Sequence, residues 1–497
     1  MTVDPREPLP GEGADAYIAR VGTSADALPA AEPPPGDHER LDDMGNARRL
    51  VHLHGMDLLY AHARKRWHVW DGRRWAEDET GDAERHAKDV VAQMFAAAAR
   101  ADDETRRKQL GAWAVKSASA PRLAALLEVA RSEREFAITG REFDRDPWLL
   151  TVDNGTLDLR TGALRPHRRE DLITRLAPVV YAPAARASRW HEFLDEILGA
   201  ELAAFLQRAV GYALTGTVSE HAVFLFYGTG ANGKSTFLET IRALLGDYAR
   251  QTDFSSFLVG RDDHVRADLA RLAGARFVTA VEAEEGRRFA ESLLKQLTGG
   301  DTVTARHYYQ AHVEFRPEFK LFLATNHKPR VWGTDLAFWR RVRLVPFTIT
   351  IPPERQDPNL ATALRAERPG ILNWALEGCW HWKTDGLQEP ATVIAATRAY
   401  QDEQDVVGQF LADRCRLSAN GSSLSAARRA VYDAYDAWCR DTGNEPLAAR
   451  AFGLRLAERG LLEAKRHGVL VWKGLELVPA ATPHEREPGE DDDDLGL

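Results

Sequence analysis

The sequence predicts an α/β protein with a P-loop core, a mixed α+β region before that core and a winged helix after it. Three observations lead to this prediction. An apolar strand runs directly into a GxxxxGK[ST] segment and a helix, two further apolar strands follow, and the last part of the chain has the order helix, helix, hairpin. Strands that alternate with helices are typical of a parallel sheet covered on both faces.

The chain has 497 residues, which is too long for one hydrophobic core, so we expect two to four domains. Both ends are rich in Pro, Gly and acidic residues, which indicates disorder. The expected divisions are a disordered leader at 1–40, an N-terminal domain at 41–186, a P-loop domain at 187–351, a helical connector at 352–416, a winged-helix-like domain at 417–480 and an acidic disordered tail at 481–497.

Composition excludes several classes of protein. No apolar run is long enough to cross a bilayer, and the first residues have no signal-peptide pattern, so we expect a cytoplasmic protein with no membrane partner. Its three cysteines, Cys379, Cys415 and Cys439, are far apart and have no histidines at metal-site spacing. They predict neither a disulfide framework nor a zinc site.

The formal charge is −9, from 65 basic and 74 acidic residues, and by itself this does not favour a nucleic-acid partner. The charge is distributed unevenly, however. Acidic residues crowd into Glu485–Asp494, whereas basic residues gather at Arg340–Arg343 and at Lys465–His467. The composition is therefore compatible with DNA bound in a local basic channel.

Hydrophobic periodicity and turn residues predict the elements of the N-terminal region. We expect a helical stretch at 42–63, a strand pair at 66–75, helices at 80–133 and further strands at 148–167. Asp71-Gly72, Asn154-Gly155 and Thr161-Gly162 are the expected tight turns.

The P-loop follows the apolar strand Ala222–Tyr227 and precedes a helix, which is the context that this motif requires. Its glycines let backbone N–H groups close on phosphates, Lys234 reaches the β- and γ-phosphate oxygens, and Ser235 offers a hydroxyl to Mg²⁺. A chance match would occur in about one chain in fifty at average glycine frequency. We therefore expect ATP and Mg²⁺ as cofactors. The binding segment is Gly228, Thr229, Gly230, Ala231, Asn232, Gly233, Lys234, Ser235 and Thr236.

Carboxylates follow a second apolar strand, Phe277–Val281. Hydrolysis needs an acid at such a strand end to hold Mg²⁺ and to orient the attacking water. Glu282 is our first choice for both roles and Glu284 is the alternative, with Glu285 beside them. An ordinary solvated acidic loop is the competing interpretation.

A third apolar strand begins at Lys320 and ends in Thr325-Asn326. The Asn326 amide at this point can contact the γ-phosphate or the attacking water. Alternatively, Asn326 caps the next turn, as asparagine often does. The series of three strands favours the role at the phosphate.

Arg340 and Arg341 precede a fourth apolar strand, in the segment FWRRVRLVPF. A guanidinium offered to the γ-phosphate of a neighbouring subunit is the arginine-finger device, and it requires an oligomer. A structural ion pair is the competing interpretation of the same residues.

The C-terminal segment has the element order of a winged helix. A helix begins near Ser423 and ends at Gly443, a second helix spans Pro446 to Gly460, and a hairpin turns at His467-Gly468. Such a module binds DNA or docks on a protein, and the sequence favours neither. The basic residues that would meet DNA phosphates are Arg450, Arg455, Arg459, Lys465 and Arg466.

Five segments in this order resemble superfamily 3 helicases, and specifically the phage/plasmid primase-helicase family related to the poxvirus primase-helicase. They are GTGANGKST, EAEEG, LKQLTGGDTVTARHYYQAHVEFRPEFK, LFLATNHKP and FWRRVRLVPF. The resemblance spans Arg40 to Val478 and is most specific over 222–347. Upstream, DDMGNARRLV, WHVWDGRRW and FDRDPWLLTVDNGTLDLRTG are similar to the N-terminal domain associated with these helicases.

This resemblance implies an AAA+-like ATPase that hydrolyses ATP as a hexameric ring and moves along single-stranded or forked DNA. It also implies a DNA-contacting hairpin within 301–320. The residues themselves agree in part, because TVTARHYY and HVEFRPEF can pair as strands around Gln310-Ala311. The candidate phosphate contacts of this segment are Lys295, Arg306, His307 and Lys320.

We therefore expect a DNA helicase of phage or plasmid replication, with other replication proteins as further partners. An initiator or DNA-binding scaffold with a regulatory ATPase is the alternative, and a packaging or defence ATPase is a third. The sequence departs from the family at one point. The expected leader is shorter than the primase domain that many members carry, and the cysteines for a zinc-binding primase module are missing, so we do not expect primer synthesis.

Overall fold

The computed structural model describes residues 40–259, 267–281, 287–306, 312–332, 335–418 and 424–478. The chain divides into two compact units, Met1–Ala177 and Pro178–Leu497. Each unit has its own sheets and its own hydrophobic core, and the two are described separately.

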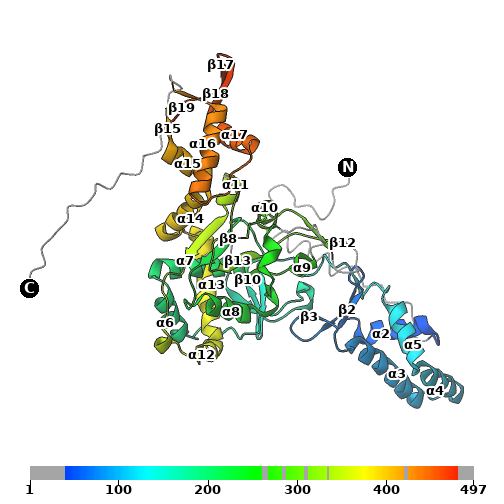
Figure 1. Cartoon of the computed structure of the whole chain (residues 1–497). Coiled ribbons are helices and arrows are strands. Elements are labelled where there is room, and N and C mark those ends of the chain that lie inside the picture. Colours follow the sequence, from blue (N-terminus) through cyan, green and yellow to red (C-terminus); the bar gives the residue numbers. More distant parts are fainter. Residues whose placement is uncertain are drawn as a thin grey trace, which may run out of the picture. The chain divides into compact units, whose positions relative to one another are not determined.

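Among its described residues, the first unit combines the α-helices α2 to α5 with two small sheets. Helices α2 to α5 lie together (Figure 1) and share a core with β1, in which Leu50, Leu58 and Val90 are fully buried. The sheets have the strand orders β3-β2-β1-β4 and β5-β6-β7. The elements are α2 (Asp43–His54), α3 (Asp82–Arg100), α4 (Glu104–Ser117), α5 (Ala120–Ala130), β1 (Leu58–Ala61), β2 (Arg66–Trp70), β3 (Trp75–Glu77), β4 (Ala137–Ile138), β5 (Leu149–Val152), β6 (Gly155–Asp158) and β7 (Ala163–Arg165).

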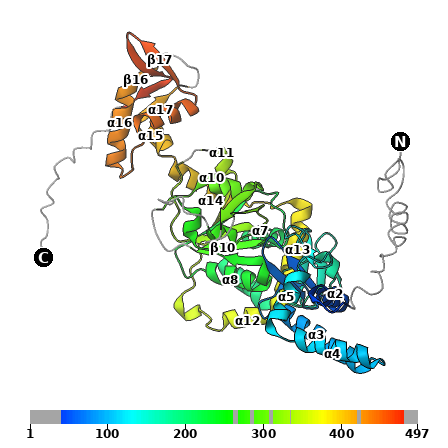
Figure 2. The same ribbon diagram turned by 90° about the vertical axis from the view of Figure 1, so that its right-hand side faces the viewer.

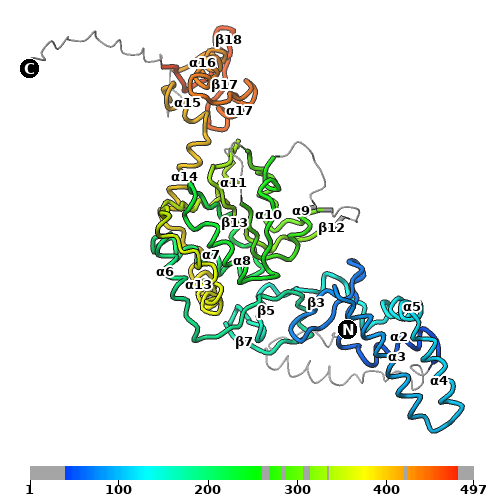
Figure 3. Tube along the Cα trace, turned by 60° about the horizontal axis from the view of Figure 1, so that its bottom comes forward, coloured from blue at the N-terminus to red at the C-terminus, as the bar shows by residue number. Residues whose placement is uncertain are grey.

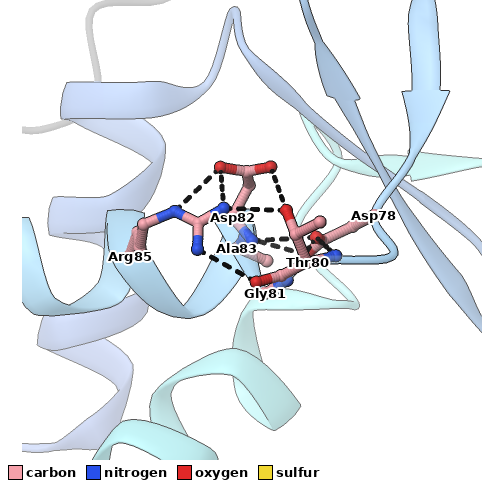
Figure 4. Close-up of polar contacts among 6 residues, drawn as sticks. All are labelled: Asp78, Thr80, Gly81, Asp82, Ala83 and Arg85. Atoms are coloured by element: carbon pink, nitrogen blue, oxygen red, sulfur yellow. Dashed lines mark hydrogen bonds and ion pairs between the residues drawn. The ribbon is translucent and has the colours of Figure 1, made fainter.

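A carboxylate fixes the start of the longest helix in this unit. Asp78 accepts hydrogen bonds from the N–H groups of Gly81 (2.7 Å), Asp82 (2.8 Å) and Ala83 (2.9 Å), as Figure 4 shows. Burial by itself would raise the pKa of Asp78, but these backbone donors together lower it below its ordinary value. The negative charge therefore satisfies helix donors that have no partner within α3.

Most of the expected elements of this unit are confirmed, and one is wrong. The strand pair at 66–75 forms with Trp70 opposite Trp75. The expected helical stretch at 42–63 ends at His54, because Leu58–Ala61 forms β1 instead. This strand pairs antiparallel with β2 and parallel with β4. Tertiary pairing therefore overrides the helical periodicity of the segment.

The second unit contains a five-stranded parallel sheet with the order β14-β8-β13-β10-β9. Its central strands β8, β13 and β10 are labelled in Figure 1. The apolar strands expected from the sequence are confirmed. The strands are β8 (Val223–Tyr227), β9 (Ala249–Gln251), β10 (Phe277–Val281), β13 (Lys320–Thr325) and β14 (Val342–Pro346).

Helices cover both faces of this sheet because successive strand residues point to opposite sides. Val223 and Leu225 belong to a core cluster that also contains Leu294 of α10. On the other face, Phe224 packs against Phe205 of α7, with ring centroids 6.0 Å apart. The helices of this part are α6 (Ser188–Ile197), α7 (Ala200–Leu214), α8 (Lys234–Leu245), α9 (Ala267–Ala270), α10 (Glu291–Gly299), α11 (Leu336–Trp339), α12 (Leu360–Ala366), α13 (Arg368–Asp385) and α14 (Ala391–Gln404).

Helices α7 and α13 lie side by side (Figure 3) and touch through glycines. A Cβ atom on Gly211 would lie 2.0 Å from the backbone nitrogen of Cys379. A Cβ atom on Gly378 would lie 2.1 Å from the carbonyl oxygen of Gln207. The two backbones can approach this closely only because both positions lack a side chain.

The expected hairpin within 301–320 is confirmed. Strands β11 (Val303–Arg306) and β12 (His312–Phe315) pair antiparallel, with Arg306 opposite His312. The expected tip, Gln310-Ala311, lies outside the described residues.

The C-terminal part of the second unit has the expected order of two helices and a hairpin (Figure 2). The hairpin turn has positive φ at both His467 (49°) and Gly468 (82°), as a two-residue turn requires. The elements are α15 (Val406–Arg414), β15 (Cys415–Leu417), β16 (Ser425–Ala427), α16 (Arg428–Asp441), α17 (Ala449–Glu458), β17 (Leu462–Arg466), β18 (Val469–Lys473) and β19 (Leu475–Leu477).

Two helix starts in this part differ from the sequence prediction. The first helix begins at Arg428 and not near Ser423, because Ser425–Ala427 forms β16 and pairs with β18. The second begins at Ala449, three residues after the expected Pro446. Among the described residues, no helix is both long and apolar enough to span a membrane.

The glycine contact between α7 and α13 predicts a large effect of one methyl group. Gly211→Ala should lower the free energy of unfolding by about 1–3 kcal/mol, because the new Cβ forces two packed helices apart. Gly111→Ala in α4 is the control, since its Cβ meets nothing within 4 Å. That change should raise stability by up to about 1 kcal/mol. Urea unfolding measures both, and equal effects of the two variants would contradict the proposed contact.

Candidate nucleotide-binding site

The candidate site lies at the edge of the parallel sheet where its strands end. Tyr227, the last residue of β8, has Thr325 of β13 as its partner on one side and Pro346 of β14 on the other. Since the strands are parallel, the loops that follow them begin side by side. Ligands of open α/β sheets bind at this kind of edge.

The loop after β8 turns sharply. Gly230, Ala231 and Gly233 have φ values of 106°, 46° and 80°, all in the left-handed region. Glycine adopts such values at little cost, whereas alanine does not. The Ala231 carbonyl accepts a hydrogen bond of 2.7 Å from the N–H of Ile351, which helps to hold the strained residue in place.

Two glycines of this loop are also required by lack of space. A Cβ on Gly228 would lie 2.3 Å from both Asn232 Nδ2 and the Phe347 carbonyl oxygen. A Cβ on Gly233 would lie 2.8 Å from Ile197 of α6. The loop is therefore packed between the segment after β14 and helix α6.

Helix α8 begins at Lys234, directly after the loop, and its N-cap residue Gly233 provides no side-chain cap. The first N–H groups of a helix have no partner inside it, and the helix dipole favours a negative charge there. Ser235, in the first turn, is exposed. These features fit a bound phosphate chain, with the Ser235 hydroxyl available to its metal ion.

Lys234 is 6 % exposed, and its ammonium group contacts three oxygens. It donates to the Gly228 carbonyl (2.5 Å), to Asn232 Oδ1 (3.2 Å) and to Asn326 Oδ1 (3.2 Å). Burial lowers the pKa of Lys234 below its ordinary value. The structure therefore brings together the loop and the amide at the end of β13.

The side chain of Thr325, and not that of Asn326, makes the turn after β13. Thr325 Oγ1 accepts a hydrogen bond from the N–H of His327 (3.1 Å) and donates to its carbonyl. The Asn326 side chain instead faces Lys234. The turn is therefore made without the Asn326 side chain, and the role of Asn326 at the phosphate stays a prediction.

The candidate acids Glu282 and Glu284 lie outside the described residues, which stop at Val281 and resume at Arg287. Val281 ends β10 and pairs with Ala324, so the segment that carries these acids begins at the same edge of the sheet as Asn326. In the described ranges there is no group of three or more His, Cys, Asp or Glu side chains that could hold a metal ion.

The two candidate finger arginines are placed differently. Arg341 donates to the Ala337 carbonyl (2.5 Å) and to Thr298 Oγ1 (3.2 Å), and burial lowers its pKa. Arg340 ends the short helix α11 with an exposed side chain, and in the described residues no hydrogen bond or ion pair of its guanidinium is found. The structural interpretation therefore fits Arg341, and the finger fits Arg340.

Fewer of the candidate DNA-phosphate contacts in and near the hairpin β11–β12 can be placed than the sequence suggests. Lys295, in α10, forms an ion pair with Asp335 (N···O 2.6 Å). The side chain of Arg306 and the whole of His307 lie outside the described part of the chain. Arg316, directly after β12, is exposed and was missed, although its position next to a strand of the hairpin is a usable signal.

The structure corrects the role expected for Lys320. Its side chain is buried, and its ammonium group donates to the carbonyls of Thr215 and Glu318, the latter at 3.2 Å. It also lies 4.5 Å from the ring centroid of Tyr212. Burial and then the charge of Arg276 hold the pKa of Lys320 well below its ordinary value. Lys320 therefore anchors β13 to the end of α7 and is not placed to meet a phosphate.

The basic residues of the C-terminal helices and hairpin fall into two groups. Arg450, Lys465 and Arg466 are exposed. Arg455 and Arg459 are partly buried by contacts inside the second unit, since Arg455 donates to the Trp332 carbonyl (2.7 Å) and Arg459 pairs with Asp405. The first group is available to a large anionic partner, and the second stabilises the fold.

Two protein-family models match segments toward the two ends of the chain. A D5 N terminal like domain model matches residues 47–199, and a poxvirus D5 protein-like model matches residues 402–470. These two segments of the chain are therefore similar to D5-like domains. Between these segments, residues 226–341 match a family of unknown function. The resemblance to the poxvirus primase-helicase is thereby confirmed.

Curated relatives of this chain come from large DNA viruses. A protein of Acanthamoeba polyphaga mimivirus named "Putative helicase" is 26% identical over 297 residues, which cover 55% of this chain and 31% of the relative. A "Putative helicase" of frog virus 3 is 27% identical over 363 residues, covering 56% and 37%. A "Putative primase" of African swine fever virus is 27% identical over 339 residues, covering 62% and 35%.

The chain thus spans about a third of the length of these relatives. Among solved structures, the apo C-terminal region of NrS-1 aligns with 86% of this chain and 97% of its own, at 8% identity and a TM-score of 0.47. A likeness at that level carries no argument about function. The names of the viral relatives say helicase or primase.

Proposed function

We propose that this chain is an ATP-dependent DNA helicase of phage or plasmid replication, which acts as a hexameric ring on single-stranded DNA. In this proposal the second unit contains a P-loop ATPase core of AAA+-like fold and a C-terminal winged helix. The observation that supports it most is the placement of Lys234 between the glycine-rich loop and Asn326, at the uncapped start of α8.

The residues of the loop divide the work of binding ATP and Mg²⁺. The first N–H groups of α8 and Lys234 bind the phosphates, with the lysine exchanging its protein oxygens for phosphate oxygens. Ser235 and Glu282 hold the metal ion, and Glu282 or Glu284 orients the attacking water. Bound ATP supplies the transferable phosphoryl group, and Mg²⁺ neutralises its charge.

Asn326 acts next to Lys234 in this scheme. In the structure its Oδ1 accepts from the lysine, so its amide already lies within the reach of the group that binds the γ-phosphate. When Lys234 turns to a phosphate, the Asn326 amide can hold the attacking water or the γ-phosphate. Because Asn326 directly follows β13, the parallel sheet sets the position of its backbone.

Arg340 supplies the finger in trans. Its guanidinium is exposed, whereas its neighbour Arg341 is held by Ala337 and Thr298. Because the exposed guanidinium of Arg340 has no hydrogen-bond or ion-pair partner among the described residues of its own chain, it is available to the nucleotide of a neighbouring subunit. A complete site then requires two subunits, which is consistent with a ring.

DNA contacts come from the hairpin and from the C-terminal module. We assign Arg316 as a phosphate contact of the β11–β12 hairpin, together with Arg306 and His307. The exposed Arg450, Lys465 and Arg466 are the phosphate contacts of the winged helix. An initiator or scaffold without processive unwinding would use the same surfaces. Only a measurement of strand release distinguishes it from a helicase.

The first experiment measures release of a labelled strand from forked duplexes of both polarities, with ATP and Mg²⁺. Wild type should release the strand on one polarity. Lys234→Ala should lower ATP hydrolysis at least about 100-fold, because a preorganised charge at the phosphates is removed. Hydrolysis without release on either fork would favour the initiator or scaffold, and absence of nucleotide binding by the wild type would reject the proposal.

A second experiment mixes two inactive variants. Arg340→Ala should lower ATP hydrolysis by about 1000-fold or more, the usual value of a finger. In an equal mixture with Lys234→Ala, about one interface in four combines an intact loop with an intact finger if subunits assemble at random. Hydrolysis should therefore return toward a quarter of the wild-type rate.

Arg341→Ala is the matched control for this mixture. Because Arg341 is bonded within its own subunit, its removal should lower the melting temperature, and it should gain nothing from mixing beyond its own residual activity. If Arg340→Ala also fails to recover in the mixture, it does not act in trans.

The buried Lys320 and the exposed Arg316 predict opposite phenotypes for the same removal of one positive charge. Lys320→Ala should lower the free energy of unfolding by about 1–3 kcal/mol, since it leaves buried carbonyls without a donor. It should leave the salt dependence of DNA binding unchanged. Arg316→Ala should leave the free energy of unfolding unchanged. It should reduce the steepness of the plot of log DNA-binding constant against log salt concentration by about 0.7 for each phosphate that the protein no longer neutralises. A reduced slope for Lys320→Ala would contradict its structural role.

A further inference from the structure

The side chain of Asn232 is buried within the glycine-rich loop. It is 3 % exposed, whereas Thr229 and Ala231 on the same loop are exposed. A buried amide must find partners for its N–H and carbonyl groups, since an unsatisfied one costs about 1–3 kcal/mol. Its location is therefore set by specific contacts and not by solvent.

Both ends of this amide are used. Nδ2 donates to the carbonyl oxygen of Phe347 at 3.2 Å, and Oδ1 accepts from Lys234 Nζ at 3.2 Å. The orientation of the amide follows from these partners, because a carbonyl only accepts and an ammonium only donates. Asn232 thus forms a bridge from the segment after β14 to the lysine.

The Phe347 end of the bridge is fixed. The N–H of Phe347 donates to the Tyr227 carbonyl (2.7 Å), and its ring packs against Phe226 with centroids 4.9 Å apart. Phe347 itself is 1 % exposed. The space that a Cβ on Gly228 would need is filled by the Phe347 carbonyl and the Asn232 amide, so the first glycine of the loop makes room for the bridge.

We propose that Asn232 is a positioning residue, which acts on the nucleotide through Lys234 by tying the ammonium group to the fixed Phe347 carbonyl. The inference rests on the proposed function, because it assigns the orientation of the lysine that binds ATP. Of the three oxygens around Lys234, those of Gly228 and Asn326 lie at the ends of β8 and β13. The Asn232 oxygen is the one that brings in the segment after β14.

The test is a double-mutant cycle on the binding of a fluorescent ATP analogue, read at equilibrium with Mg²⁺ in the full chain. Asn232→Ala should raise the dissociation constant about tenfold, the effect of one charge-assisted hydrogen bond. In a Lys234→Ala background the same change should have no further effect, because its target is gone. Additive effects of the two substitutions would overturn the positioning role.

Two further variants separate positioning from folding. Asn232→Asp keeps an oxygen for Lys234 but loses the donor to Phe347, so it should bind the analogue no better than Asn232→Ala. Wild-type affinity in this variant would overturn the bridge. Asn359→Ala is the control asparagine, since Asn359 is exposed and its side chain makes no cap bond to α12. Both changes at 232 should lower the unfolding midpoint, because the Phe347 carbonyl loses its donor, so the analogue is added under conditions in which all four chains are folded.

The outcomes distinguish this inference from the proposed function. If the wild-type chain does not bind the analogue, both are rejected. If it binds and the cycle is additive, the nucleotide site stands and the role of Asn232 does not. If it binds and the cycle is non-additive, Asn232 positions the lysine.

Discussion

The contact of the Lys234 ammonium with three oxygens depends on the register of the parallel sheet. Gly228 follows β8 and Asn326 follows β13, and the two strands end opposite each other at Tyr227 and Thr325. A shift of one residue in this pairing would turn every side chain of a strand to the other face. Burial on both faces prevents such a shift, because it would also place the rings of Phe224 and Phe226 in the wrong layer.

Helices α7 and α13 pack closely, and this packing helps to hold the strands that carry the candidate site. Helices α7 and α13 touch through Gly211 and Gly378, while Lys320 bonds the end of α7 from the first residue of β13. The charged end of a lysine is costly to bury unless it is hydrogen-bonded. Its burial here shows how strongly the start of β13 is held, and β13 is the strand that ends in Asn326.

In the sequence, strand β14 separates the candidate finger arginines from the residues that contact the glycine-rich loop. Arg340 and Arg341 precede it, and Phe347 and Ile351 follow it and hold Asn232 and Ala231. The edge of β14 that does not face β8 is covered by α14, where Thr397 Oγ1 accepts from the N–H of Leu344 (2.9 Å). Strand β14 thus connects the exposed Arg340 to the residues that contact the glycine-rich loop.

The sequence by itself determined the order of strands, loop and helices around the parallel sheet, because apolar runs, glycine and turn residues act locally. It also placed Lys234 and Asn326 among the candidates, since each follows a strand or loop of recognisable type. It could not decide that Leu58–Ala61 pairs as β1 or that Ser425–Ala427 pairs as β16, because pairing depends on distant partners.

Only the tertiary structure decided which basic side chains are available. Lys320, Arg341 and Arg316 are all basic residues next to strands, yet the first two are bonded inside the fold and the third is exposed. The same holds for Asn232, which the motif treats as a variable position and the fold buries against Phe347. A residue's type sets which bonds it can make, whereas burial and the neighbours brought by packing decide which of them it makes.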